Sequence, residues 1–233
     1  MMPPSIFEGF PPAGLQFFAD LKANNNREWF NENRATFDND FIAPAKAFIL
    51  SLGGLLQSLH PGFGFDTRTN GSGSLFRIYR DVRFSKDKSP YKTSLGMNFW
   101  LGRSKKTTDN PGFYVGIGSQ GAGVYAGMWQ FPKPMLERYR RIVDDVEEGE
   151  HLTAILNRLA ADGYEIAEPH YKRVPRGFDK DHPNAELLKK NAINAAKKQI
   201  PASVVTSPDF VPTCFEHCLA MWPLVEWLHE NVS

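Results

Sequence analysis

The chain has 233 residues, of which 42% are hydrophobic and 13% aromatic, and this composition excludes an intrinsically disordered protein because it can bury a full core. Its formal charge of +1 at pH 7 argues against a dedicated duplex-DNA binder, whose binding domain is usually strongly basic. The sequence shows no signal-peptide pattern and no stretch that we expect to span a membrane, so it predicts a cytoplasmic protein without a membrane partner.

The first part of the chain, residues 12–60, has apolar residues at helical spacing and predicts two or three helices. Asn26 is expected to cap the helix that contains Trp29 and Phe30, because an asparagine side chain accepts hydrogen bonds from backbone N–H groups of the first turn. Pro44 fits the first turn of a later helix, where its missing N–H costs little.

The next part, residues 75–130, alternates with a period of two and predicts an antiparallel sheet of about four or more strands. The loop 102–111 and the turn 119–121 are too short for helical crossovers, so they are expected to join neighbouring strands as hairpins. Many glycines in this part indicate curvature, bulges or a close approach of another backbone. The expected strands are 75–84, 93–101, 112–118 and 123–129.

The last part, residues 132–233, is expected to be mostly helical and to pack on the sheet. A helix is predicted to start at Pro183, and a final helical segment from Pro208 is expected to be interrupted near Pro223. Because the chain shows no repeat, low-complexity tract or linker, the sequence predicts a single α+β domain over residues 1–233.

Residues 77–92, which we call the basic segment, concentrate charge as no other part of the sequence does. They include six cationic side chains and two carboxylates, so their local charge is +4 while the rest of the chain carries −3. A strongly positive segment in a chain whose other residues are slightly acidic predicts an anion nearby. Arginine forks suit bidentate contacts with phosphate or carboxylate, and flexible lysines can close over such a group.

On a strand, alternate side chains share a face, so Arg77, Tyr79, Asp81 and Arg83 are expected to form one polar row in which Asp81 orients its neighbours. Arg80 falls on the apolar face unless a bulge redirects it. The alternative is a solvated sheet face where the arginines only pair with acidic residues. The candidate ligand-binding residues in the basic segment are Arg77, Arg80, Asp81, Arg83, Lys86, Asp87, Lys88, Tyr91 and Lys92.

The same residues carry a resemblance to a known family. The pattern Arg77-x-x-Arg80-Asp81-x-Arg83-Phe84-x-x-Asp87-Lys88-x-x-Tyr91 resembles the signature of bacterial conserved hypothetical proteins called domain of unknown function 2461. Similarity at 25–30 and at 175–183 extends the resemblance over nearly the whole chain. It implies a small, mainly bacterial, single-domain protein, and it brings no established activity, substrate or cofactor.

The stretch 170–183 is a second concentration of side chains capable of chemistry. The imidazoles of His170 and His182 are candidate general acids or bases, and Arg176 extends the positive surface as a further ligand-binding candidate. The structural alternative is a turn at Arg176-Gly177 and a cap, by Asp181 or His182, on the helix that begins at Pro183. We favour Asp181 as the cap because aspartate commonly precedes a helix that begins with proline. The carboxylates and imidazoles here lack an established metal-ligand spacing, so no metal site is predicted.

The only two cysteines, Cys214 and Cys218, lie four residues apart on a predicted helix. Together with His217 they invite a zinc interpretation, but the sequence supplies no fourth ligand. Reduced cysteine is among the most buried residue types, so both thiols are expected in the core.

Several functions remain open at this stage. The favoured one is binding of an anionic, phosphorylated small ligand or nucleotide through the basic segment. The alternatives are an enzyme acting on such a ligand, with Asp81, His170 or His182 as acid or base, and a structural ion-pair network only. A nucleic-acid or protein interaction module, which is not favoured, requires Phe84 or Tyr91 to be exposed for stacking. The sequence identifies no cofactor and does not decide whether the protein is an enzyme.

Overall fold

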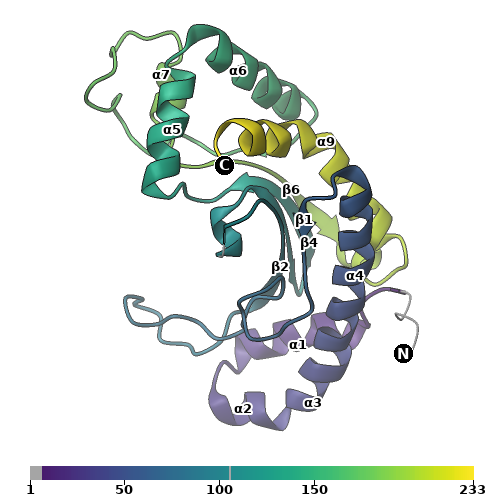
Figure 1. Cartoon of the computed structure of the whole chain (residues 1–233). Coiled ribbons are helices and arrows are strands. Elements are labelled where there is room, and N and C mark those ends of the chain that lie inside the picture. The colour runs from purple at the N-terminus through teal and green to yellow at the C-terminus, as the bar shows by residue number, and fades with distance from the viewer. Residues whose placement is uncertain (1–6, 105) are drawn as a thin grey trace. The chain divides into compact units, whose positions relative to one another are not determined.

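The computed structural model describes residues 7–104 and 106–233 (Figure 1). N-terminal helices precede a six-stranded antiparallel sheet, and a long helix ends the chain, so the predicted α+β class is confirmed. The strand order is β1-β2-β3-β4-β6-β5. The strands are β1 (Phe63–Gly64), β2 (Ser94–Leu101), β3 (Gly112–Gly118), β4 (Gly121–Met128), β5 (Glu165–Ile166) and β6 (Ile193–Pro201).

Two helices carry the start signals that the sequence predicts. The Asn26 side chain accepts a hydrogen bond from the Trp29 N–H at 3.0 Å, and Pro44 lies in the first turn of its helix, which confirms both predictions. The helices are α1 (Pro12–Ala23), α2 (Arg27–Glu32), α3 (Arg34–Thr36), the π-helical η1 (Phe37–Ile42), α4 (Ala43–Leu59), the 3₁₀ turn η2 (Thr107–Asp109), α5 (Lys133–Val143), α6 (Val146–Ala161), α7 (Ala185–Leu188), α8 (Ala202–Val205) and α9 (Phe210–Asn231).

The described chain divides into two compact units, each with its own buried side chains. The first unit comprises residues 7–99, Tyr114–Val124 and Lys198–Glu216, and the second comprises Trp100–Phe113, Tyr125–Lys197 and 217–233. The single domain expected from the sequence stays a prediction.

The first unit is built around phenylalanine. Phe18 of α1 meets Phe41 of η1 edge to face at 4.8 Å between ring centroids, and Phe48 of α4 stacks on Phe210 at the same distance. All four rings are essentially inaccessible to solvent. Aromatic pairs add stabilisation beyond the area that they bury, so this cluster fixes the helices that will form one wall of the site.

One helical stretch, Arg34–Leu59, is by length and composition apolar enough to cross a membrane. Its apolar face, including Phe48, Ile49 and Leu52, is fully buried within the unit. The core helix of a soluble protein passes the same test of length and composition, so the stretch is weak evidence for a membrane span.

Glycine in the first unit permits one close approach of two backbones. Gly121 at the start of β4 has φ +132°, and a Cβ there would lie 2.1 Å from the Ile200 carbonyl oxygen of β6. Any other residue would collide with that backbone. One expected glycine function, close backbone approach, is therefore present in the sheet.

The second unit packs its helices around Tyr139 of α5. The ring is fully buried and stacks on Phe131 at 4.9 Å, and its hydroxyl donates to the Leu187 carbonyl at 3.0 Å. Burial raises the pKa of the Tyr139 phenol far above its ordinary value, so the hydroxyl remains a hydrogen-bond donor.

Two expectations for the last part of the chain are corrected. Residues 193–201, within the part expected to be mostly helical, form strand β6, whose Ala195 and Ala196 pair with β5. Helix α9 runs through Pro223 without interruption. Proline removes one helical hydrogen bond, but Leu224 and Leu228 just beyond it are fully buried, and this packing holds the helix together.

Candidate functional site

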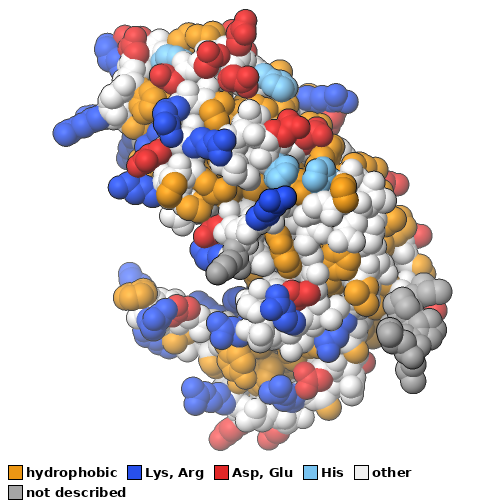
Figure 2. All heavy atoms as spheres, in the orientation of Figure 1, with side chains coloured by type: hydrophobic (Ala, Val, Ile, Leu, Met, Phe, Trp, Pro, Cys, Tyr) orange, Lys and Arg blue, Asp and Glu red, His pale blue; other side chains and the backbone are white. Residues whose placement is uncertain are grey.

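The two ends of the basic segment are paired with each other. Tyr79 and Tyr91 form an isolated antiparallel bridge, and the Arg80 N–H donates to the Pro90 carbonyl at 2.9 Å. Between them the chain runs as an irregular loop, the coil that precedes β2 in Figure 1. In Figure 2, basic and apolar side chains gather on this projecting coil.

The expected strand 75–84 is therefore wrong beyond isolated bridges at Leu75 and Tyr79. The reason lies in the two aspartates. The Asp81 carboxylate accepts from the Arg83 N–H at 3.2 Å, and the Asp87 carboxylate accepts from the Ser89 N–H at 2.9 Å. Such local side-chain bonds compete with strand pairing and bend the chain into turns, so the single polar row of side chains does not form.

Arg80 is held inside the loop by three partners. Its guanidinium forms an ion pair with Asp87 and donates to the Ser89 and Ser85 hydroxyls at 2.5 and 3.4 Å. The hydrogen bond from Arg80 lowers the pKa of Asp87 to about 2. Only 27% of the Arg80 side chain is exposed, so Asp87 positions a half-buried cation that the sequence had placed on an apolar face.

Arg83 and Asp81 form a separate pair on the outside of the loop. The guanidinium donates to both carboxylate oxygens at 2.9 and 2.7 Å, and this hydrogen bonding lowers the pKa of Asp81 to about 2. Both side chains are largely exposed. Asp81 is consequently ionised at neutral pH and a weak base, which does not favour it as an acid–base catalyst. Phe84 beside them is 95% exposed.

The loop and α2 enclose a pocket of about 660 Å³, which we call the loop pocket. Among the described residues that line it, three carry positive charge and none carries a carboxylate. The lining residues are Asn25, Asn26, Arg27, Asn31, Tyr79, Arg80, Val82, Lys88, Pro90 and Tyr91.

The floor of the loop pocket is fixed by α2 and by Asn25, two residues before it. The Asn25 side chain accepts from the Tyr91 N–H at 3.0 Å and donates to the Tyr91 carbonyl at 2.9 Å, as a neighbouring strand would. Phe30 stacks on the Tyr91 ring at 4.2 Å, and Tyr91 is only 3% exposed. Tyr91 is therefore part of the pocket's foundation, and its ring is not presented for stacking.

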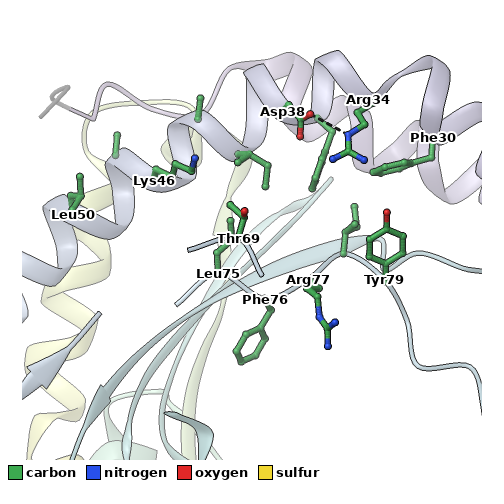
Figure 3. A pocket seen from close by; sticks show the side chains of 15 residues that line it. Phe30, Arg34, Asp38, Lys46, Leu50, Thr69, Leu75, Phe76, Arg77 and Tyr79 are labelled. Atoms are coloured by element: carbon green, nitrogen blue, oxygen red, sulfur yellow. Dashed lines mark hydrogen bonds and ion pairs between the residues drawn. The ribbon is translucent and has the colours of Figure 1, made fainter. Parts of the chain in front are cut away.

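A second pocket of about 580 Å³, the helix pocket, lies between the helices and residues 69–79 (Figure 3). Its described lining is largely apolar, with Arg34, Lys46 and Arg77 as cations and Asp38 as a carboxylate. Asp38 pairs with Arg34 at 3.2 Å and raises its pKa. The lining residues are Phe30, Arg34, Phe37, Asp38, Ile42, Ala43, Lys46, Ala47, Leu50, Thr69, Leu75, Phe76, Arg77, Ile78 and Tyr79.

Tyr79 lines both pockets and is half exposed. Figure 3 shows its hydroxyl directed toward Arg34, and Tyr79 contributes, after Asp38, to raising the Arg34 pKa. Arg77 points away from these helices.

Lys86 and Lys92 of the basic segment lie outside the loop pocket, whereas Lys88 lines it. The Lys92 ammonium donates to the Arg77 carbonyl at 3.0 Å, and burial together with Arg77 lowers its pKa. Lys86 is exposed on the loop and lines neither pocket. Lys88, two residues later, lines the loop pocket and donates to the Val82 carbonyl at 2.9 Å.

The stretch 170–183 belongs to the second unit and forms turns. The ring of His182 contacts the Asp144 carbonyl oxygen at 2.9 Å and accepts from the Asn184 N–H at 3.0 Å. His182 thus organises the turn before α7, whereas Asp181, expected as the cap, is exposed and pairs with Lys180.

The other candidates there are at the surface or have only local contacts. Arg176 is exposed in a turn with Gly177, as the structural alternative predicted, and His170 packs edge to face on Tyr171 at 4.7 Å. Across residues 7–104 and 106–233, no group of three His, Cys, Asp or Glu side chains is arranged to hold a metal ion. Cys214 and Cys218 are both buried, and burial raises the Cys218 pKa.

Most of the helical contribution to the pockets could not be predicted from the sequence. Asn31, Arg34 and Lys46 belong to no motif that stands out in the sequence. They lie on helices whose apolar spacing explained the sequence without them. The available signal was a run of polar side chains on the outer faces of amphipathic helices.

These features define a small α+β protein with a cation-lined pocket formed by a helix and an irregular loop. The chain belongs to the family described as conserved hypothetical protein (DUF2461), whose model matches residues 13–227. Comparison with curated proteins and with solved structures finds no match.

Proposed function

We propose that the protein binds a phosphorylated small molecule, with its phosphoryl group in the loop pocket. The observation that carries the proposal is the charge of that pocket, where Arg27, Arg80 and Lys88 converge without a carboxylate in the described lining. The whole chain has nearly equal numbers of acidic and basic residues. A cavity lined by one sign of charge concentrates counter-ions of the other sign, so an anion is the complementary ligand.

The three cations differ in ways that suit phosphate. Arg80 is fixed in place because Asp87, Ser85 and Ser89 accept hydrogen bonds from three of its five N–H groups, which leaves two for a ligand. Arg27 is exposed and donates no hydrogen bond to any residue that the structure describes. Lys88 gives one of its three donors to Val82 and retains the others for a ligand. The pocket therefore offers donors whose present partners do not exhaust them.

A second candidate is a surface for single-stranded nucleic acid, and one observation favours it. Phe84 is 95% exposed at the loop, with the Arg83 guanidinium 5.9 Å from the centre of its ring. Exposed aromatic rings among cations are typical of stacking platforms for bases. Tyr91, the other expected platform, is buried.

Calorimetric titration with pyrophosphate tests the proposal, because two lysines of one loop provide a matched pair. Lys88→Gln removes a cation of the loop pocket, and we expect it to weaken pyrophosphate binding about tenfold, the value of one charge-assisted hydrogen bond. Lys86→Gln removes the same charge two residues away and outside the pocket, and we expect a much smaller change.

Equal losses from the two variants would show that only general surface charge matters and would contradict the proposal. Tight, salt-dependent binding of an oligonucleotide that Phe84→Ser weakens, together with no pyrophosphate binding, would favour the second candidate.

A further inference from the structure

The helix pocket contains more apolar surface than a phosphoryl group needs. It lies within the size range of small-molecule sites, and Ile42 and Leu50 line it from the helices while Leu75 and Ile78 line it from the opposite segment (Figure 3). Of the polar groups in the described lining, Asp38 and Arg34 are paired with each other and Arg77 points away from the helices. This leaves Thr69, Tyr79 and Lys46 for hydrogen bonds to a ligand.

The Leu50 side chain contributes little to the buried core of the first unit. It is 42% exposed on α4, in the same helix whose Phe48, Ile49 and Leu52 are fully buried in the core. An exposed apolar side chain at a pocket gains stabilisation when a ligand covers it, at about 25 cal/mol for each Å² removed from water.

The two pockets share one wall. Tyr79 lines both, and its phenol combines an apolar ring with a hydroxyl directed toward Arg34. A ligand that passes Tyr79 would place a charged group beside Arg27, Arg80 and Lys88 and an apolar group beside Leu50. The loop pocket is lined by cations and the helix pocket is largely apolar, so a molecule with one charged end and one apolar end would match both.

From this juxtaposition we infer that the ligand is a phosphate monoester with an aliphatic or aromatic body, which occupies the helix pocket. The inference rests on the proposed phosphoryl site and specifies what is attached to the phosphoryl group. Lys46, exposed at the helix side of the pocket, has a long apolar stem that can lie along such a body while its ammonium stays in water.

A series of alkyl phosphates tests the inference by titration calorimetry. Inorganic phosphate, butyl, octyl and dodecyl phosphate share one charged head and differ in the length of the body, and the longest chain can extend from the loop pocket past Tyr79 toward Leu50. We expect the dissociation constant to fall about fourfold for each methylene group that becomes buried.

The variant Leu50→Gln should reduce this gain per methylene and leave the affinity for inorganic phosphate unchanged. Leu55→Gln is the matched control, because Leu55 lies on the same helix, is 36% exposed and does not line the pocket. Both positions are partly exposed, so both variants are expected to fold.

The possible results distinguish the inferred site for the ligand body from the proposed phosphoryl site. An affinity that rises with chain length in the native protein and in Leu55→Gln, but less in Leu50→Gln, supports the inference. An affinity independent of chain length, with pyrophosphate still bound and still sensitive to Lys88→Gln, overturns the inference alone. Absence of binding by pyrophosphate and by every alkyl phosphate overturns both.

Discussion

The basic segment and the stretch 170–183 are alike in composition and opposite in organisation. Both combine arginine, lysine and aspartate within a short length of chain. In the stretch 170–183, His182 and its neighbour Asn184 are taken up by turn and cap contacts with backbone groups. In the basic segment, the Arg80 guanidinium is paired with Asp87 and also lines a pocket.

The difference shows that the number of charged groups does not identify a site. A binding site is identified by side chains that still have free N–H donors after they have bonded to the protein's own carboxylates and carbonyls. Asp81 and Asp87 have the same lowered pKa of about 2, yet only the arginine paired with Asp87 faces a pocket. The following predictions use that contrast.

The largest expected effect is on stability and lies in the second unit. Asn184 is 6% exposed, and its side chain donates to the Val143 and Asp145 carbonyls at 3.1 Å. Asn184→Ala leaves these acceptors without their donor, and we expect a loss of about 2–3 kcal/mol in the free energy of unfolding, measured with urea. Pyrophosphate affinity of the folded variant should not change, and a selective loss of affinity would assign this stretch to the site.

The next effect concerns the anchor of Arg80. Asp87→Asn removes the ion pair that positions this guanidinium, and we expect pyrophosphate affinity to fall about tenfold by calorimetry. Asp81→Asn is the control, because it removes an equivalent exposed carboxylate whose partner Arg83 does not line either pocket. If both variants lose affinity equally, the two pairs are equivalent and the contrast fails.

A smaller effect is expected from pH. The folded pKa of Asp87, about 2, lies below its ordinary value of 3.8, so the pair favours the folded loop above pH 3.8 and this contribution is lost as pH falls through 2. In a carboxyl-carbon NMR titration, Arg80→Gln should raise the Asp87 midpoint toward 3.8 and leave that of Asp81 near 2. A native Asp87 midpoint already near 3.8 would show that the pair does not form.

Hydrophobic periodicity was sufficient to predict the sheet strands that follow the basic segment. The expected strand 112–118 coincides with β3, because its apolar residues face a buried core on alternate positions. The same pattern failed at 75–84, since aspartate side chains there take the backbone hydrogen bonds that a strand would use.

The two pockets were harder to predict from the sequence than the strands were. Arg27 and Arg80 are far apart along the chain and meet because Asn25 binds both backbone groups of Tyr91 and Phe30 stacks on its ring. No local pattern encodes these contacts. Arg80 itself was correctly selected for its charge, but its orientation depends on Asp87 and two serines across the loop.

Arginine side-chain NMR during a pyrophosphate titration tests the central claim most directly. The Nε–H signals of Arg27 and Arg80 should shift together and saturate with one bound ligand, while the signal of Arg83, which lines neither pocket, should stay nearly fixed. Shifts confined to Arg83, or equal shifts at all three arginines without saturation, would contradict a phosphoryl site in the loop pocket.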